Sequence, residues 1–188
     1  MALTEEAQQL LAATYADFDR ATPARRIGRM VGSGPLGAYD SNRVRCESAY
    51  LRLISIVEAY VDSLCSELFR QQTSHQGPMF RALVAAAEAR ASTNWDERKT
   101  AFNDYHSVSL SSCSRWSEVD AGIYVRNAIA HGLGSLTRRQ RSQKVRSKIR
   151  SVDVAVVDNR LVLTDVALVR CLSFSNDFIR SIDTGVRL

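Results

Sequence analysis

The sequence predicts a mostly α-helical protein, a helical bundle with a short β-hairpin before its last helix. Long stretches without glycine or proline place apolar residues at helical spacing, which is typical of amphipathic helices. Residues 152–163 instead alternate apolar and polar side chains around a turn, as a hairpin does. A length of 188 residues suits one domain, residues 1–188. We expect an amino-terminal helix and loop over residues 1–39 and the bundle core over residues 40–188.

Composition places the chain among soluble globular proteins. Hydrophobic residues make up 45% and charged residues 24%, which excludes wholesale disorder. No stretch approaches the roughly 18 apolar residues that cross a bilayer. Glu5 and Glu6 stand where a secretion signal would carry basic residues. We therefore expect a cytoplasmic protein without a membrane partner.

Cysteine and histidine residues are too dispersed to predict a metal site. The sequence holds no Cys-x-x-Cys pair and no Cys–His spacing that could organise zinc. We expect buried free thiols in a reducing cytosol, and no metal or other cofactor. The residues concerned are Cys46, Cys65, Cys113, Cys171, His75, His106 and His131.

The first predicted helix ends at about residue 20 and a loop follows it. Thr4 is the expected cap, with two glutamates in the first turn at the positive end of the helix dipole. Residues 22–42 hold two prolines, four glycines and three arginines, which predicts an irregular surface loop. No Gly-Lys-Ser/Thr follows these glycines, so a phosphate-binding loop is excluded.

Two further helices are predicted from about Asp40 to the middle of the chain. Between Asp40 and Gln71 there is no glycine or proline, and apolar residues recur at spacings of four, four, three and four. Pro78 suits the first turn of the next helix. After residues 92–94, the stretch 95–110 is either a continuation of that helix or a second short one. The recurring apolar residues are Leu53, Val57, Val61, Leu64 and Leu68.

The carboxyl-terminal half holds the remaining predicted elements. A helix capped by serines near residue 112 runs to His131, with Gly132 as its left-handed stop. Asp158 and Asn159 form the turn of the predicted hairpin. Either Thr164 or Asp165 then caps the last helix. Trp95 and Trp116 are expected to anchor the core, and His106 to be a packing or surface residue.

The stretch YVRNAIAHGLG, residues 124–134, carries a possible chemistry. On a helix, Asn127 and His131 share a face, and Arg126 lies five residues before His131, about 140° round the axis and roughly 7.5 Å along it. Imidazole, with a pKa of about 6.5, moves protons near neutrality, and guanidinium suits phosphate charge. These groups match RNA cleavage by its own 2′-hydroxyl. From spacing alone, a histidine that caps helix carbonyls beside a solvated face is the favoured interpretation.

Seven basic residues and no acid lie between Arg138 and Arg150. Without them the chain has 18 basic and 20 acidic residues, so the positive charge belongs to this basic segment. It would attract RNA without regard to sequence, and the absence of aromatic residues excludes readout by stacking. A solvated charge run is the alternative. The expected RNA-binding residues are Arg138, Arg139, Arg141 and Lys144.

Residues 126–132, RNAIAHG, resemble the Arg-polar-x-x-x-His signature of the HEPN superfamily, and the order of elements over roughly residues 40–185 resembles its stand-alone RiboL-PSP-HEPN type. The resemblance implies a HEPN-like bundle and a metal-independent endoribonuclease that leaves a cyclic phosphate. It implies a homodimer in which Arg126 and His131 are the catalytic pair and Asn127 supports them. It also implies an acid on the long helix, for which Glu58 is the candidate ahead of Glu47. Glu58 could equally be a partner of Arg126 that only holds the bundle together.

Family members of this kind include toxins and antiphage proteins, so we expect RNA as partner and a possible antitoxin or other regulator. One toxin group of the superfamily carries His-x-Tyr and is controlled by a nucleotidyltransferase antitoxin. Here Gly132 and Leu133 follow His131, which argues against that form of control. The alternative functions are a HEPN-like module that binds RNA or a nucleotide without cutting it, and a structural helical protein in which the same residues only make packing contacts.

Overall fold

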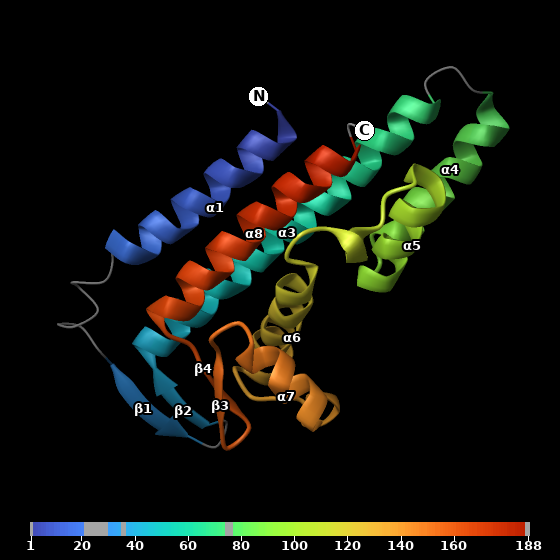
Figure 1. The fold of residues 1–188 in the computed structure, drawn as a ribbon. Helices are drawn as coiled ribbons and strands as arrows, with labels where there is room; N and C mark the ends of the chain where they lie inside the picture. The colour runs from blue at the N-terminus through green and yellow to red at the C-terminus, as the bar shows by residue number, and fades with distance from the viewer. Residues whose placement is uncertain (1, 21–29, 35–36, 74–76, 187–188) are drawn as a thin grey trace.

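Three long helices form the body of the protein. The structure is a computed structural model that describes residues 2–20, 30–34, 37–73 and 77–186. Helix α3 (Ser41–Thr73) runs beside α8 (Asp165–Val186) in the same direction, and α1 (Leu3–Arg20) packs against both in the opposite direction (Figure 1). The expected mostly α-helical fold with a hairpin before its last helix is therefore confirmed.

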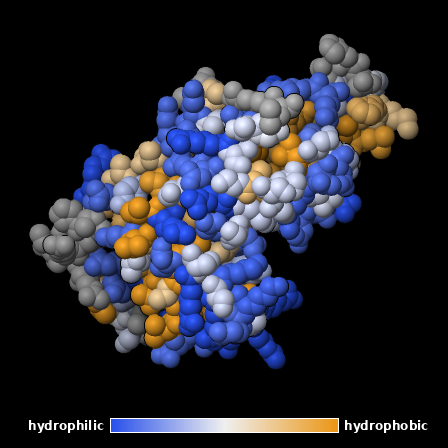
Figure 2. Space-filling model, in the orientation of Figure 1, coloured by the Kyte–Doolittle hydropathy of each residue, from blue (hydrophilic) through white to orange (hydrophobic). Residues whose placement is uncertain are grey.

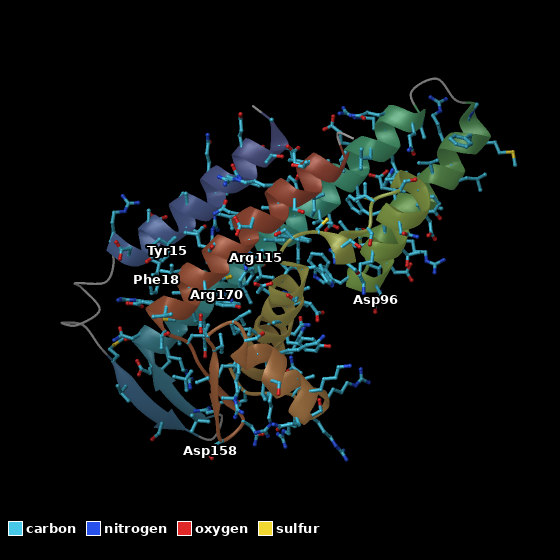
Figure 3. All side chains as sticks on the ribbon, in the orientation of Figure 1. Tyr15, Phe18, Asp96, Arg115, Asp158 and Arg170 are labelled. Carbon is cyan, nitrogen blue, oxygen red and sulfur yellow. The ribbon has the colours of Figure 1, made fainter. Side chains whose placement is uncertain are left out.

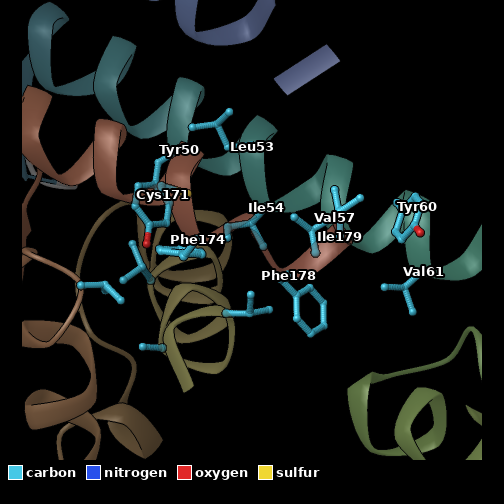
Figure 4. Close-up of a cluster of buried hydrophobic side chains, with 14 of the residues drawn as sticks. Tyr50, Leu53, Ile54, Val57, Tyr60, Val61, Cys171, Phe174, Phe178 and Ile179 are labelled. Carbon is cyan, nitrogen blue, oxygen red and sulfur yellow. The ribbon is translucent and has the colours of Figure 1, made fainter. Parts of the chain in front are cut away.

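The core lies along the seam between α3 and α8. Tyr50, Leu53, Ile54 and Val57 of α3 are fully buried, and Tyr50, Ile54 and Val57 lie beside residues of α8 (Figure 4). Apolar residues of α8 recur every three or four positions, so that one stripe of the helix faces α3. The buried apolar residues of α8 are Ala167, Leu168, Cys171, Phe174, Phe178, Ile179 and Ile182.

Helices α4 (Pro78–Ala91) and α5 (Trp95–His106) pack on the carboxyl-terminal half of α3. Pro78 occupies the first turn of α4, as expected. The stretch after residue 94 is a separate helix, because the Asn94 side chain accepts hydrogen bonds from the backbone N–H groups of Asp96 and Glu97 and so begins a new one. Arg98 of α5 ties this helix to Asp62 of α3.

Helix α6 (Trp116–Gly132) follows the one-turn helix η1 (Leu110–Ser112). Both expected ends of α6 are wrong in detail. Its first cap is Arg115 in a left-handed conformation, without a side-chain cap from serine. Its stop is Leu133, also left-handed, followed by Gly134 at φ +79°, whereas Gly132 is the last helical residue. A glycine two residues beyond the helix therefore relieves the backbone there.

The expected cap of the first helix is also wrong, and so is the expected loop where it coincides with strands. Helix α1 begins at Leu3, so Thr4 lies inside its first turn, with its hydroxyl 3.3 Å from that of Tyr60. Within residues 22–42, strands β1 (Val31–Gly34) and β2 (Gly37–Asp40) form an antiparallel hairpin. Glycines favour loops by composition, but here Gly34 and Gly37 are paired residues of two strands. Residues 22–29 and 35–36 of that expected loop lie outside the described residues.

The segment after α6 is ordered as two short helices and a second hairpin. The one-turn helix η2 (Arg138–Gln140) leads into α7 (Gln143–Arg150), a helix that the sequence analysis did not predict. Strands β3 (Ala155–Val157) and β4 (Arg160–Val162) form the expected hairpin, with Asp158 at its tip (Figure 3). The Thr164 hydroxyl accepts a hydrogen bond from the Ala167 N–H, so Thr164 is the cap of α8.

Candidate functional site

One partly exposed face of α6 carries most of the polar residues of the motif. Asp120, Tyr124, Asn127 and His131 follow one another at spacings of four, three and four, which places them on a single face of the helix. The opposite side of α6 is buried, and Gly122 allows close packing there because a Cβ at this position would lie 2.8 Å from Ile54 Cδ1. The imidazole of His131 is exposed in the last turn.

The imidazole of His131 does not cap the end of α6. The carbonyl oxygen of Ala128 is bound by backbone N–H groups of the residues after the helix, including Gly134 at 3.2 Å. Among the described residues, none forms a hydrogen bond or an ion pair with the His131 side chain. Backbone geometry therefore ends the helix, and the histidine stays available to solvent.

Arg126 points away from the exposed face, toward α3. Its Nη2 lies 3.5 Å from Glu58 Oε2, and its Nη1 donates to Asn127 Oδ1 at 3.1 Å. Its Nε is buried and has no hydrogen-bond partner in the described part of the chain. About a third of the side chain is exposed, 30%. The guanidinium thus has two loose contacts and further donors that these contacts do not use.

Glu58 of α3 has a second partner. Its Oε1 accepts a hydrogen bond from Trp95 Nε1 at 3.0 Å, so its two oxygens serve different helices. Trp95 opens α5 and is only half-buried, with its ring 5.5 Å from that of Trp116. Trp95 does more than the packing that was expected of it, because its indole N–H also donates to a carboxylate. Trp95, Glu58, Arg126 and Asn127 form one chain of contacts.

This chain of contacts joins two parts of the molecule. Asp96, the neighbour of Trp95, lies at the end of α5 that faces the α6–α7 region (Figure 3). The surface is indented between the α4–α5 pair and the α6–α7 pair (Figure 2). Arg126 of α6 is linked to Trp95 of α5 through Glu58 of α3.

The structure does not bring all motif residues together in one copy of the chain. No hydrogen bond or ion pair among the described residues joins Arg126 to His131. Asn127 links them indirectly, because it contacts the guanidinium and lies one turn before His131 on the exposed face. A single copy offers one imidazole and one guanidinium on neighbouring flanks of α6.

Glu47 of α3, the less favoured acidic candidate, lies beside the carboxyl-terminal end of α6. Its carboxylate is buried against Gly134, and Arg43 Nε is 3.4 Å from its Oε1. Burial raises the pKa of the Glu47 carboxyl, and the charges of Arg43 and Arg160 offset part of the rise. Glu47 therefore supports the loop after the motif, while Glu58 is the acid that reaches Arg126.

The basic segment packs along α6. The Gln140 amide donates to the Tyr124 carbonyl at 2.8 Å, and the Lys148 ammonium contacts Asp120 and lies 5.3 Å from the centroid of the Tyr124 ring. The contact with Asp120 raises the pKa of Lys148. Lys148 is thus held beside the same face that carries Asn127 and His131.

The expected RNA-binding residues lie on the outside of this segment. Arg138, Arg139, Arg141 and Lys144 are all exposed. Arg141 Nε donates to the Leu136 carbonyl at 3.5 Å. The side chains of the other three form no hydrogen bond or ion pair with the described residues. Arg146 is tied down instead, because its Nη2 donates to Asn159 Oδ1 at 2.6 Å.

Sequence reasoning missed Asp120, Tyr124, Lys148 and Trp95 as neighbours of the motif. The first two could have been found by continuing the helical face back from His131, since the spacing is regular. Lys148 and Trp95 have no such signal, because contacts between segments far apart in the sequence place them there.

The remaining reactive side chains are not assembled into a metal site. Within the described residues, no group of three or more His, Cys, Asp or Glu could hold a metal ion. Three of the four cysteines are buried, and Cys113 is partly exposed. Burial raises the pKa of the Cys65 thiol to about 11, which makes its thiolate scarce at neutral pH. No described helix is both long and apolar enough to span a membrane.

Comparisons of the chain with protein-family models, with curated proteins and with solved structures found no match.

Proposed function

We propose that this protein is a cytoplasmic, metal-independent endoribonuclease of the HEPN type. The observation that supports it most is the state of Arg126, whose side chain is partly exposed and whose guanidinium is held by single contacts to Glu58 and Asn127. It keeps donors for a phosphate, and Asn127 lies one turn from the exposed imidazole of His131.

In the proposed reaction the 2′-oxygen of the RNA attacks the neighbouring phosphorus, and the bond from phosphorus to the 5′-oxygen breaks. The products are a 2′,3′-cyclic phosphate and a free 5′-hydroxyl. His131 gives a proton to the leaving oxygen, and Arg126 stabilises charge on the phosphate oxygens. A second copy supplies the imidazole that takes the proton from the 2′-hydroxyl, so the active form is a homodimer with the two α6 helices at a shared cleft.

The basic segment would hold RNA near this cleft. Its exposed cations lie on the segment that packs along α6, close in the fold to the proposed catalytic face. Attraction of this kind is independent of sequence and weakens as salt rises. A role in growth arrest or antiphage defence, under an antitoxin or another regulator, fits an enzyme that cuts RNA without strict sequence choice.

The test is incubation of the purified protein with total RNA in EDTA. We expect cleavage that survives chelation, leaves cyclic phosphate ends, and is lost in His131→Ala and in Arg126→Lys. His106→Gln is the control, because this histidine packs against Phe69 and Phe102 and contacts no residue of the motif among the described residues. Equal cutting by wild type and His131→Ala would reject the site.

A binding module is the second candidate, and the pairing of Arg126 with Glu58 favours it, because such a pair also holds helices together without chemistry. It predicts that the wild-type protein retains RNA in a filter-binding assay without cutting it. A protein that neither binds nor cuts RNA would contradict both proposals.

A further inference from the structure

The carboxylate of Glu58 is shared between Trp95 and Arg126. The indole N–H of Trp95 donates to Glu58 Oε1 at 3.0 Å, and Glu58 Oε2 lies 3.5 Å from Arg126 Nη2. A carboxylate with both oxygens free would accept the parallel pair of hydrogen bonds that guanidinium favours. Here one of the two oxygens accepts the indole N–H, and Arg126 contacts only the other.

A second arginine of the same region shows the alternative. Arg98 binds Asp62 through two hydrogen bonds of 2.7 and 2.8 Å, and its side chain is 11% exposed. Asp62 lies on α3 one turn beyond Glu58, so the two pairs occupy neighbouring positions on one helix. Arg98 therefore binds its acid through two short hydrogen bonds, whereas Arg126 meets Glu58 through one longer contact.

The position of Trp95 is itself fixed from three sides. It is the first residue of α5, directly after the cap Asn94. The guanidinium carbon of Arg98 lies 5.2 Å from its ring, and the Trp116 ring lies 5.5 Å away. The direction of its N–H is therefore set by the packing of α5 against α3 and α6.

We propose that Trp95 is a positioning residue that keeps Arg126 available to phosphate by occupying one oxygen of Glu58. Without the indole N–H, the Glu58 carboxylate turns toward Arg126 and binds it through both oxygens, as Asp62 binds Arg98. The guanidinium then has fewer donors for the substrate. This inference rests on the proposed function, in which Arg126 contacts the phosphate, but the state of the Arg126 side chain can be measured without any reaction.

Trp95→Phe tests the proposal, because it keeps an aromatic ring and removes the N–H. Trp116→Phe is the matched control, since this neighbouring tryptophan makes ring contacts and its N–H has no hydrogen-bond partner among the described residues. We expect Trp95→Phe to lower kcat for RNA cleavage roughly tenfold or more, the size of effect that a hydrogen bond to a charged group has, while Trp116→Phe keeps kcat within about twofold of the wild type.

The double variant Trp95→Phe with Glu58→Gln separates positioning from a general loss of packing. A neutral glutamine cannot clamp the guanidinium as a carboxylate does, so the double variant should cleave faster than Trp95→Phe alone. Equal or lower activity of the double variant would overturn the proposal, because a packing defect is not repaired by changing Glu58.

Nuclear magnetic resonance of the Arg126 side chain gives a reading that is independent of catalysis. A bidentate pair slows rotation of the guanidinium, so Trp95→Phe should show slower Nη exchange than wild type and Trp116→Phe. If the wild type cleaves no RNA yet this slowing is seen, the proposed function fails and the positioning role stands. Identical Arg126 spectra in the two phenylalanine variants would reject the positioning role.

Discussion

The carboxylate of Glu47 occupies the space into which a side chain at Gly134 would project. A Cβ built on Gly134 would lie 2.2 Å from Glu47 Oε1, and the backbone of Gly134 has φ +79°. The last turn of α6, which carries His131, is therefore followed by a residue that must be glycine for two reasons. The buried acid and the loop after the motif depend on each other.

Gly134→Ala should destabilise the protein. A side chain in the left-handed region costs about 1–2 kcal/mol, and Glu47 must also move. Urea unfolding should show a loss of at least about 1 kcal/mol in the free energy of unfolding. Gly132→Ala is the matched control, because its nearest side-chain neighbour would be Thr137 Cγ2 at 3.9 Å. If both alanine variants unfold at the same urea concentration, the special role of Gly134 is wrong.

Glu47→Gln should stabilise the protein at neutral pH. The pKa of Glu47 is raised in the folded state by burial, so the folded protein holds this proton more tightly than the unfolded chain. Stability from this group is present below the unfolded pKa, about 4.5, and is lost as pH rises through the folded pKa. The difference in Tm between Glu47→Gln and wild type should therefore grow from pH 4 to pH 7. A constant difference would contradict this.

Acid should destabilise the protein through His106, because the pKa of this residue is lowered in the folded state, whereas that of Glu47 is raised. Burial lowers the pKa of His106 below 6.5, and its ring lies 4.7 Å from that of Phe69. The unfolded chain therefore binds this proton more readily than the folded protein, and stability is lost as pH falls below about 6.5 toward the lower folded pKa. Thermal unfolding of His106→Gln should depend less on pH between 7 and 5 than that of wild type. An unchanged pH profile would exclude His106 as the cause.

The pair of Arg98 and Asp62 should matter more for stability than the pair of Arg126 and Glu58. Arg98 is 11% exposed and makes two hydrogen bonds to Asp62, whereas Arg126 is 30% exposed and makes one longer ion pair. We expect Asp62→Asn to cost about 1–3 kcal/mol of unfolding free energy, because a nearly buried charge loses its partner. Glu58→Gln should cost less, and the reverse order in chemical denaturation would show that Arg126 is the main structural arginine.

Neutralising Arg138 and Arg139 should weaken RNA binding. Both are exposed on the segment that packs along α6, and each phosphate contact that is lost should reduce the slope of log affinity against log salt by about 1. The double glutamine variant should therefore lose about 2 in slope if both contact phosphate. Arg81→Gln with Arg180→Gln is the control, with the same charge removed from exposed positions of α4 and α8. Equal slopes of log affinity against log salt for the two variants would show that Arg138 and Arg139 do not contact RNA phosphates.

The periodicity of apolar residues was sufficient to predict an element where one face of that element packs against the core. The apolar residues of α3, from Leu53 to Leu68, recur at helical spacing, and the structure has a helix over Ser41–Thr73. The turn at Asp158 and Asn159 was also predictable, because two residues with positive φ favour these side chains in a hairpin. Local rules failed where glycine allows two outcomes, as at Gly34 and Gly37, which form a hairpin where a loop was expected.

The sequence by itself determined the helical class, the place of the motif on α6 and the face shared by Asn127 and His131, since these follow from residue spacing along one helix. Only the tertiary structure decided that Arg126 meets Glu58, that Trp95 takes the second oxygen of that acid, and that Lys148 lies beside Tyr124. The physical reason is that these contacts join residues 24 to 68 positions apart, and helix packing, which no local pattern encodes, sets such distances.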